Sequence, residues 1–206
     1  MSGLDLAAVN SGYCRIVAAS ISSPPGLEVE PLAFDAIVPE EKTFLGRLEL
    51  AKRVSKLVEG SDLVVLEDYA RRIGRSNTTA YECGEFVGQV KERVIAQGIP
   101  LLIVPPTTMR SYVGAARNSG KFVMEEWAEE VYGFASGLST MKKRSDVADA
   151  FIHCTIGALY YFAKTGKLER EVVDPRQSRI IYGDGKMEGL IDRSGVLVGE
   201  IGDHSG

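Results

Sequence analysis

Residues 63–68 read Leu-Val-Val-Leu-Glu-Asp, four apolar side chains followed directly by two carboxylates. A short, continuous apolar run predicts a central strand that is buried in the core. A second run of this kind covers residues 100–104 and is stopped by two prolines. Apolar residues at helical spacing over 44–59 and 78–97 place a helix before each run. The middle of the chain therefore predicts central strands that alternate with helices.

Three further strands are expected on the N-terminal side of this unit. Residues 3–9 predict a buried strand interrupted by Asp5, and the turn signal Asn10-Ser11-Gly12 follows it. Residues 13–21 and 28–38 predict the second and third strands. A three-stranded meander followed by helix–strand alternation indicates an α/β fold, with a mixed sheet flanked by helices.

The C-terminal part predicts more helices and then a change of character. Helices are expected over 107–113, 121–132 and, as the last long one, Ser145 to Lys164. Beyond them, Asp184-Gly185 and Ser194-Gly195 separate short β-like runs at 179–182, 186–191 and 196–201. We interpret residues 1–164 as one domain and residues 165–206 as a small β-rich C-terminal extension.

The composition sets broad limits on the class of protein. The chain has 206 residues, of which 45% are hydrophobic and 25% charged, as is usual for one globular domain with a core. Its first residues carry no basic signal-peptide region, and its longest apolar helical stretch is shorter than the ~20 residues of a membrane span, so a cytoplasmic protein is expected. Three separated cysteines and two histidines argue against a disulfide framework and a structural zinc site.

The basic residues are unevenly distributed in this chain of net charge −4. Three stretches without any acid, residues 69–81, 105–124 and 142–144, carry most of the candidate anion-binding side chains. They contain Arg71, Arg72 and Arg75; Arg110, Arg117 and Lys121; and Lys142, Lys143 and Arg144. Such clustering in an acidic chain predicts a local surface that binds anions such as phosphates.

Four carboxylates occur at positions where a charge is costly. Asp5 lies within an apolar strand, Glu67 ends another, and Asp146 and Asp149 are expected in the first turn of the last helix, three residues apart on one face. Carboxylates ~4 Å apart repel by a few kcal/mol per pair at an intermediate dielectric. A divalent cation removes that penalty, and ligands with oxygen donors alone suit Mg²⁺ or Mn²⁺.

Each acid also has an ordinary explanation when it is taken alone. Asp5 could be a hydrogen-bonded core or turn aspartate, and Glu67 an exposed acid at the end of a strand. Asp146 could be a helix N-cap, with Asp149 placed favourably in the helix dipole. The combination favours a shared site, because one sheet could bring all three elements together.

The ordered motifs resemble the RuvC branch of the ribonuclease H-like nucleases, and look most similar to phage-encoded members. The resemblance covers about residues 1–162. It is carried by Gly3-Leu4-Asp5 before a glycine turn, Val64-Val65-Leu66-Glu67, Val104-Pro105-Pro106, Arg110 and Lys121 at the family's basic spacing, and Ser145-Asp146-Val147-Ala148-Asp149-Ala150.

This resemblance implies a five-stranded mixed sheet whose second strand is antiparallel. It also implies two Mg²⁺ or Mn²⁺ ions held by Asp5, Glu67, Asp146 and Asp149, with Lys121 stabilising charge in the transition state. The expected activity is endonucleolytic cleavage of branched DNA (Holliday junctions, forks or flaps) by a homodimer in recombination, replication or DNA processing. If the gene is carried by a phage, the protein would work in the host cytoplasm.

Two departures from the family pattern concern the DNA contacts. Arg110 stands where the family often has lysine, and the two cations hold phosphate differently. Tyr69 is the nearest candidate for the family's junction-stacking aromatic, with a core position as the competing interpretation. The neighbouring run of arginines predicts either DNA contacts or a solvated loop.

Two other functions compete with the nuclease interpretation. An ATPase of the related actin-like fold would need glycine-rich phosphate loops, and the chain has no G-x-x-x-x-G-K-[ST] motif. A non-catalytic DNA-binding protein could keep the same fold, although the four acids argue against it. Metal-dependent nicking of a junction distinguishes these possibilities.

Overall fold

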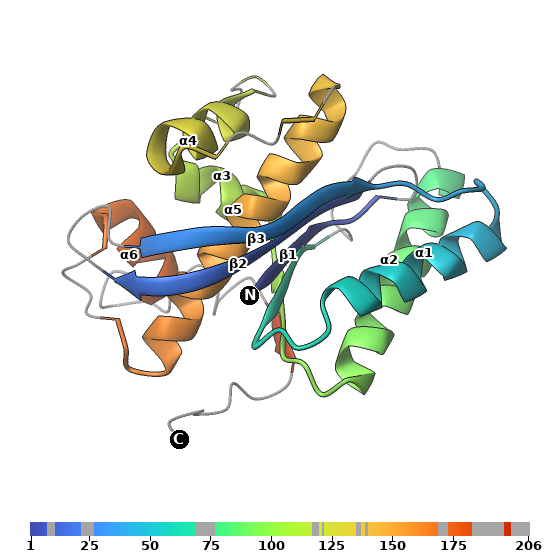
Figure 1. Ribbon diagram of the computed structural model, residues 1–206, viewed down its shortest axis with the longest axis horizontal. Helices are drawn as coiled ribbons and strands as arrows, with labels where there is room; N and C mark the ends of the chain where they lie inside the picture. The colour runs from blue at the N-terminus through green and yellow to red at the C-terminus, as the bar shows by residue number, and fades with distance from the viewer. Residues whose placement is uncertain are drawn as a thin grey trace.

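The computed structural model shows a single mixed sheet with helices on both faces (Figure 1). The structure describes residues 1–7, 11–21, 27–68, 77–116, 120, 122–134, 137–138, 140–168, 173–182 and 196–198. No helix in these ranges is both long enough and apolar enough to cross a membrane.

Within the described part of the chain, the sheet has six strands in the order β3-β2-β1-β4-β5-β6. Their bounds are β1 Ser2–Asp5, β2 Ser11–Ile21, β3 Leu27–Ile37, β4 Val64–Glu67, β5 Leu101–Val104 and β6 Val196–Val198. β2 is antiparallel to both β1 and β3, whereas β4 pairs in parallel with β1 and β5. The expected mixed sheet with an antiparallel second strand is confirmed, and β6 extends it by pairing antiparallel with β5.

The helices bury the two faces of the sheet separately. Helices α1 (Phe44–Leu57) and α2 (Asn77–Ala96) share one hydrophobic cluster with Leu4 and Leu66. Helices α3 (Pro106–Val113), α4 (Val123–Tyr132), α5 (Met141–Lys164) and α6 (Pro175–Tyr182) form the other cluster, together with Cys14 and Val65. The sheet thus lies between two layers of helices, and α5 runs along the face opposite α1 and α2 (Figure 1).

The start of the last long helix differs from the expectation. α5 begins at Met141, not Ser145, because Thr140 is its N-cap and accepts a hydrogen bond from the backbone N–H of Lys143 at 3.4 Å. Lysine and arginine favour helix interiors, so the basic stretch 142–144 continues the helix toward its N-terminus. The prediction that Asp146 and Asp149 occupy the first turn is therefore wrong, as is the N-cap alternative for Asp146.

The C-terminal tail is less β-rich than expected. The prediction of a β-like run at 179–182 is wrong, because α6 covers Pro175–Tyr182. Asp174 accepts hydrogen bonds from the backbone N–H groups of Arg176 and Gln177 at 2.8 and 3.4 Å, and proline follows it at the first helical position, which is a favourable helix start. The run 196–201 is confirmed as a strand over Val196–Val198, whereas 186–191 lies outside the described residues.

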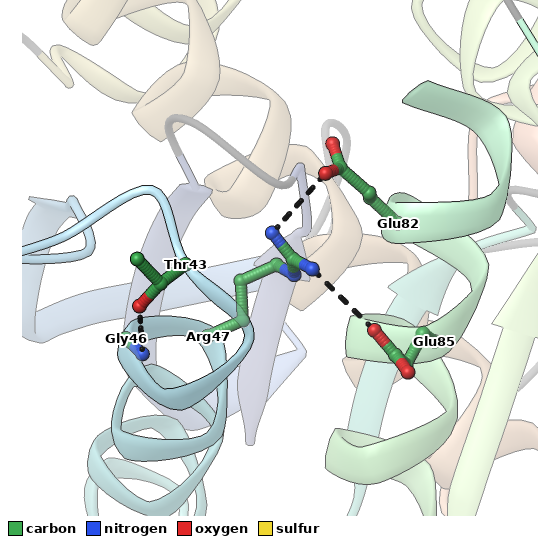
Figure 2. Close-up of polar contacts among 5 residues, drawn as sticks. All are labelled: Thr43, Gly46, Arg47, Glu82 and Glu85. Carbon is green, nitrogen blue, oxygen red and sulfur yellow. Dashed lines mark hydrogen bonds and ion pairs between the residues drawn. The ribbon is translucent and has the colours of Figure 1, made fainter. Parts of the chain in front are cut away.

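A buried arginine links the two helices on the first face of the sheet (Figure 2). Thr43 caps α1 by accepting the Gly46 backbone N–H at 3.1 Å, and Arg47 in the first turn is 7% exposed. Its two terminal nitrogens lie 3.5 Å from Glu82 and 3.5 Å from Glu85, both on α2. One guanidinium thus compensates two acids on the neighbouring helix.

Changing Arg47 to alanine is expected to destabilise the protein by roughly 1–2 kcal/mol. Removal of the cation leaves two carboxylates facing each other, but they are 37% and 27% exposed, so water reduces the penalty below that of a fully buried pair. Urea unfolding measures the change. The control is Lys52→Ala, since the Lys52–Glu49 pair is exposed within α1 and is expected to be worth about 0.3–0.5 kcal/mol. Equal losses in the two variants would contradict the structural role of Arg47.

Candidate active site

Two of the four candidate acids end neighbouring parallel strands. The register pairs Gly3 with Val65 and Leu4 with Leu66, so the next residues along the two strands are Asp5 and Glu67. Alternate residues on a strand point to opposite faces. Leu4 and Leu66 belong to the α1–α2 cluster, and therefore Asp5 and Glu67 project to the α5 side. Both are buried, with 6% and 2% of their surface exposed.

Helix α5 lies directly against this pair because two glycines allow a close approach. A Cβ atom on Gly3 would overlap the carbonyl oxygen of Ala150, and a Cβ atom on Gly12 would overlap that of Asp146. Gly12 is the register partner of Asp5 on β2. The backbone of Asp146 therefore packs onto the part of the sheet that carries Asp5.

Asp146 and Asp149 complete the set from the second and third turns of α5. They are three residues apart and share a helix face, and both are partly buried. The four acids thus come from two strand ends and one helix, in one region of the molecule. The register and the glycine contacts place the two strand ends and α5 side by side.

The chemistry of these side chains suits a hard divalent cation. All four donors are carboxylates, the ligands that Mg²⁺ and Mn²⁺ favour, and burial of Asp5 and Glu67 is costly without a compensating positive charge. Within the described ranges, however, no three Asp, Glu, His or Cys side chains already lie close enough to form a metal-binding group. The acids therefore share a region and a suitable donor set, but their side chains do not form a closed cage.

The candidate DNA-binding residues fall into two groups. The first turn of α5 contains Lys142, Lys143 and Arg144, of which Lys142 and Arg144 are exposed. Arg110 lies partly buried in α3, and this helix packs against α5 and α6. The candidates Tyr69, Arg71, Arg72, Arg75, Arg117 and Lys121 lie outside the described residues. The basic stretch at 142–144 is thus at the same end of α5 as the two helical acids.

Two residues near these elements carried weaker signals in the sequence. His153, one turn beyond Asp149 on α5, is completely buried. Glu125 on α4, partly buried and 4.0 Å from Arg144 on α5, is a candidate ligand-binding residue that the sequence does not single out. The amphipathic helix α4 has ten residues, and four of them are glutamates. No spacing rule distinguishes Glu125 from the other three, which are exposed.

Comparison with known proteins identifies the fold. No protein-family model matches the chain, and no curated protein is similar to it in sequence. Among solved structures, RuvC of Thermus thermophilus in complex with a Holliday junction substrate superposes with a TM-score of 0.60 at 16% identity, over 81% of this chain and 96% of that chain. The same protein in a second structure gives a TM-score of 0.62 at 15% identity with the same coverage.

A third solved structure of similar architecture comes from a eukaryote. The yeast mitochondrial Holliday junction resolvase superposes with a TM-score of 0.53 at 17% identity, over 75% of each chain. All three superpositions extend over at least three quarters of this chain. The chain has the fold of RuvC and of the yeast mitochondrial Holliday junction resolvase.

Proposed function

We propose that this protein is a metal-dependent, structure-selective endonuclease that hydrolyses phosphodiester bonds in branched DNA. The observation that carries the proposal is the shared face of Asp5 and Glu67 beneath Asp146. The names of the proteins with the same fold support it, because they are resolvases of Holliday junctions. A shared fold does not determine the reaction, so the proposed chemistry rests on the four acids.

In this proposal Asp5, Glu67, Asp146 and Asp149 hold two Mg²⁺ or Mn²⁺ ions. When bound, such ions lower the pKa of water and stabilise the charge on the leaving oxygen. The protein contributes the fixed positions of the acids at the strand ends and on α5. Lys121 is proposed to stabilise the additional charge on the phosphate in the transition state.

DNA binding is assigned to the basic residues. Lys142, Lys143 and Arg144 at the start of α5 would contact phosphates, together with Arg110 and with the candidates in 69–75 and at 117 and 121. Contacts of this kind recognise the path of the backbone and not the base sequence. A homodimer would present two sites to a four-way junction, so that two strands are cut. Three further statements stay predictions. They are a domain boundary between residues 164 and 165, a phage origin of the gene and a cytoplasmic location.

A panel of labelled DNAs tests the proposed function. Four-way junction, fork, flap, duplex and single strand are incubated with Mg²⁺, with Mn²⁺ and with EDTA. We expect cuts in the branched DNAs with either metal, leaving 5′-phosphate and 3′-hydroxyl ends, and none in EDTA. Absence of cleavage under all conditions would contradict the proposal, and equal cleavage in EDTA would contradict its metal dependence.

One observation favours a second candidate, a DNA-binding protein without catalysis on this fold. The acids within the described part of the chain are not gathered into a metal-binding group. The same panel separates the two candidates, because the second would shift the junction in a gel and leave every strand intact with either metal.

A further inference from the structure

A cavity of about 320 Å³ lies between α4 and α5, on a side of α5 away from the candidate metal ligands. Ala148 and Arg144 line it from α5, and Glu125 and Glu129 line it from α4. Ala148 follows Asp146 by two positions, and residues two apart on a helix do not share a face. The cavity is thus separate from the acids, although both occur along the first turns of one helix.

Glu125 gives this cavity a buried hydrogen-bond acceptor. Its Oε1 atom is shielded from solvent and accepts no hydrogen bond from any residue in the described ranges. Its Oε2 atom lies 4.0 Å from Nε of Arg144, at the limit of an ion pair. Burial raises the pKa of Glu125, so the carboxylate lacks the hydration it would have in water. A ligand that donates hydrogen bonds to both oxygens would supply what is missing.

The side chains on the other walls of the cavity are apolar. Phe134, Leu138 and Ala148 line it. Phe134 is 6% exposed and is held in place by Phe151, with parallel rings 4.3 Å apart, and by the edge contact of Phe34 at 5.2 Å. The volume lies at the small end of the range for ligand pockets, roughly 300–1,000 Å³, and is large enough for one purine-sized ring system.

We propose that this cavity binds the guanine base of an unpaired nucleotide in the DNA, which makes it a base-selective subsite. The inference rests on the proposed function, since it assumes a DNA ligand. Guanine carries two adjacent donors, N1–H and the N2 amino group, which match the two oxygens of one carboxylate. Its O6 atom accepts hydrogen bonds from a guanidinium, and arginine is the commonest partner of that atom in DNA recognition.

The other bases match this arrangement less well. Adenine and cytosine place an acceptor nitrogen beside their amino group, so one carboxylate oxygen would face a lone pair. Thymine has a single N–H donor between two carbonyl oxygens, which would both repel the carboxylate. The Glu125–Arg144 pair is therefore complementary to guanine in its pattern of donors and acceptors, and the aromatic and aliphatic walls accept the faces of a base.

The position of the cavity indicates which nucleotide it would hold. The first turn of α5 carries Lys142 and Lys143, which can neutralise the phosphate attached to the bound base. The acids on α5 point elsewhere, so the base in the cavity belongs to a neighbour of the attacked nucleotide. The subsite would favour cleavage next to a guanine within a branch. This preference would act in addition to the recognition of DNA shape.

Binding of short single strands tests this subsite without requiring cleavage. Fluorescence anisotropy in EDTA compares a labelled oligothymidylate with the same strand carrying one central guanine, hypoxanthine, adenine or cytosine. We expect guanine to improve the dissociation constant by about fivefold or more, the lower end for a bidentate contact. Hypoxanthine, which lacks the N2 amino group, is expected to give an intermediate value.

The matched variants are Glu125→Gln and Glu130→Gln, both on α4. Glu130 is exposed and does not line the cavity. The first change should remove the guanine preference and keep binding to oligothymidylate, whereas the second should keep both. Circular dichroism checks that both variants fold.

Two results would overturn the subsite while leaving the proposed nuclease intact. They are equal affinity of the unmodified protein for all five strands, and a guanine preference that survives in Glu125→Gln. Absence of binding to every strand, together with no binding or cleavage of junction DNA, would instead overturn the proposed function and this inference with it.

Discussion

Changing Asp149 to asparagine is expected to abolish cleavage of branched DNA, while the protein stays folded and still binds the junction. Asparagine has the shape of aspartate but carries no charge, so it holds a divalent cation far less well. Loss of several kcal/mol of charge stabilisation would slow cleavage by at least about a hundredfold. Because Asp149 is only partly buried on α5, the substitution leaves the core packing unchanged.

Single-turnover cleavage of a labelled four-way junction measures this effect, and a gel-shift assay in Ca²⁺ or EDTA measures binding. Asp62→Asn is the matched control, because Asp62 is exposed and precedes β4 at the opposite end of the strand from Glu67. We expect the control to cut at the normal rate. A normal rate for Asp149→Asn would remove this acid from the metal site, and the same result for Asp5→Asn would end the nuclease proposal.

Changing Gly12 to alanine is expected to destabilise the fold by about 3 kcal/mol, the upper part of the range for an overpacked core. The added methyl group would overlap the carbonyl oxygen of Asp146, which belongs to the backbone of α5 and cannot rotate away. The helix would have to move off the sheet, and with it both of its acids. A lower midpoint of urea unfolding and a loss of cleavage are therefore expected together.

Gly88→Ala on α2 is the control for this substitution. A Cβ atom there meets no atom within 4 Å, and alanine is favoured over glycine in a helix interior, so a gain of about 0.5–1 kcal/mol is expected. If Gly12→Ala were as stable as the unmodified protein, α5 would not pack on the sheet as closely as described, and the placement of Asp146 over Asp5 would be lost.

Most of the sheet could be predicted because its strands carry strong local signals. The run at 63–67 contains only apolar residues before Glu67, and the observed β4 differs from it by one residue. The N-terminal strand was predicted too long, since β1 ends at Asp5. Alternation of Leu4 with Gly3 and Asp5 then determines which face each side chain occupies.

The start of α5 and the structure of the tail were harder to predict for physical reasons. Thr140 and Ser145 are both acceptable N-caps, and only the packed structure selects Thr140. Residues 179–182, with two isoleucines and a tyrosine, have strand propensity, yet the preceding Asp174 and Pro175 start a helix that buries Ile180 and Ile181. Tertiary burial outweighs local preference in this segment.

The candidate site was predictable only in part. The acids stand out because a carboxylate inside an apolar run is unusual, and the register brings Asp5 and Glu67 together as expected. The cavity at Glu125 gave no such signal, because its aromatic wall, Phe134, lies in a loop and contacts Phe34 from a distant strand. Contacts between segments 100 residues apart in the sequence have no local pattern.

The last strand of the sheet has a consequence for synthesis on the ribosome. β6 covers the edge of β5, but Val196 is translated 92 residues after Val104 (196 minus 104). At roughly 5–20 residues per second, the hydrogen-bonding groups along Leu101–Val104 have no strand partner on that side for about 5–18 s. An open apolar edge invites pairing with other nascent chains. Chaperone demand during expression should therefore fall once the C-terminal segment has emerged and closed this edge.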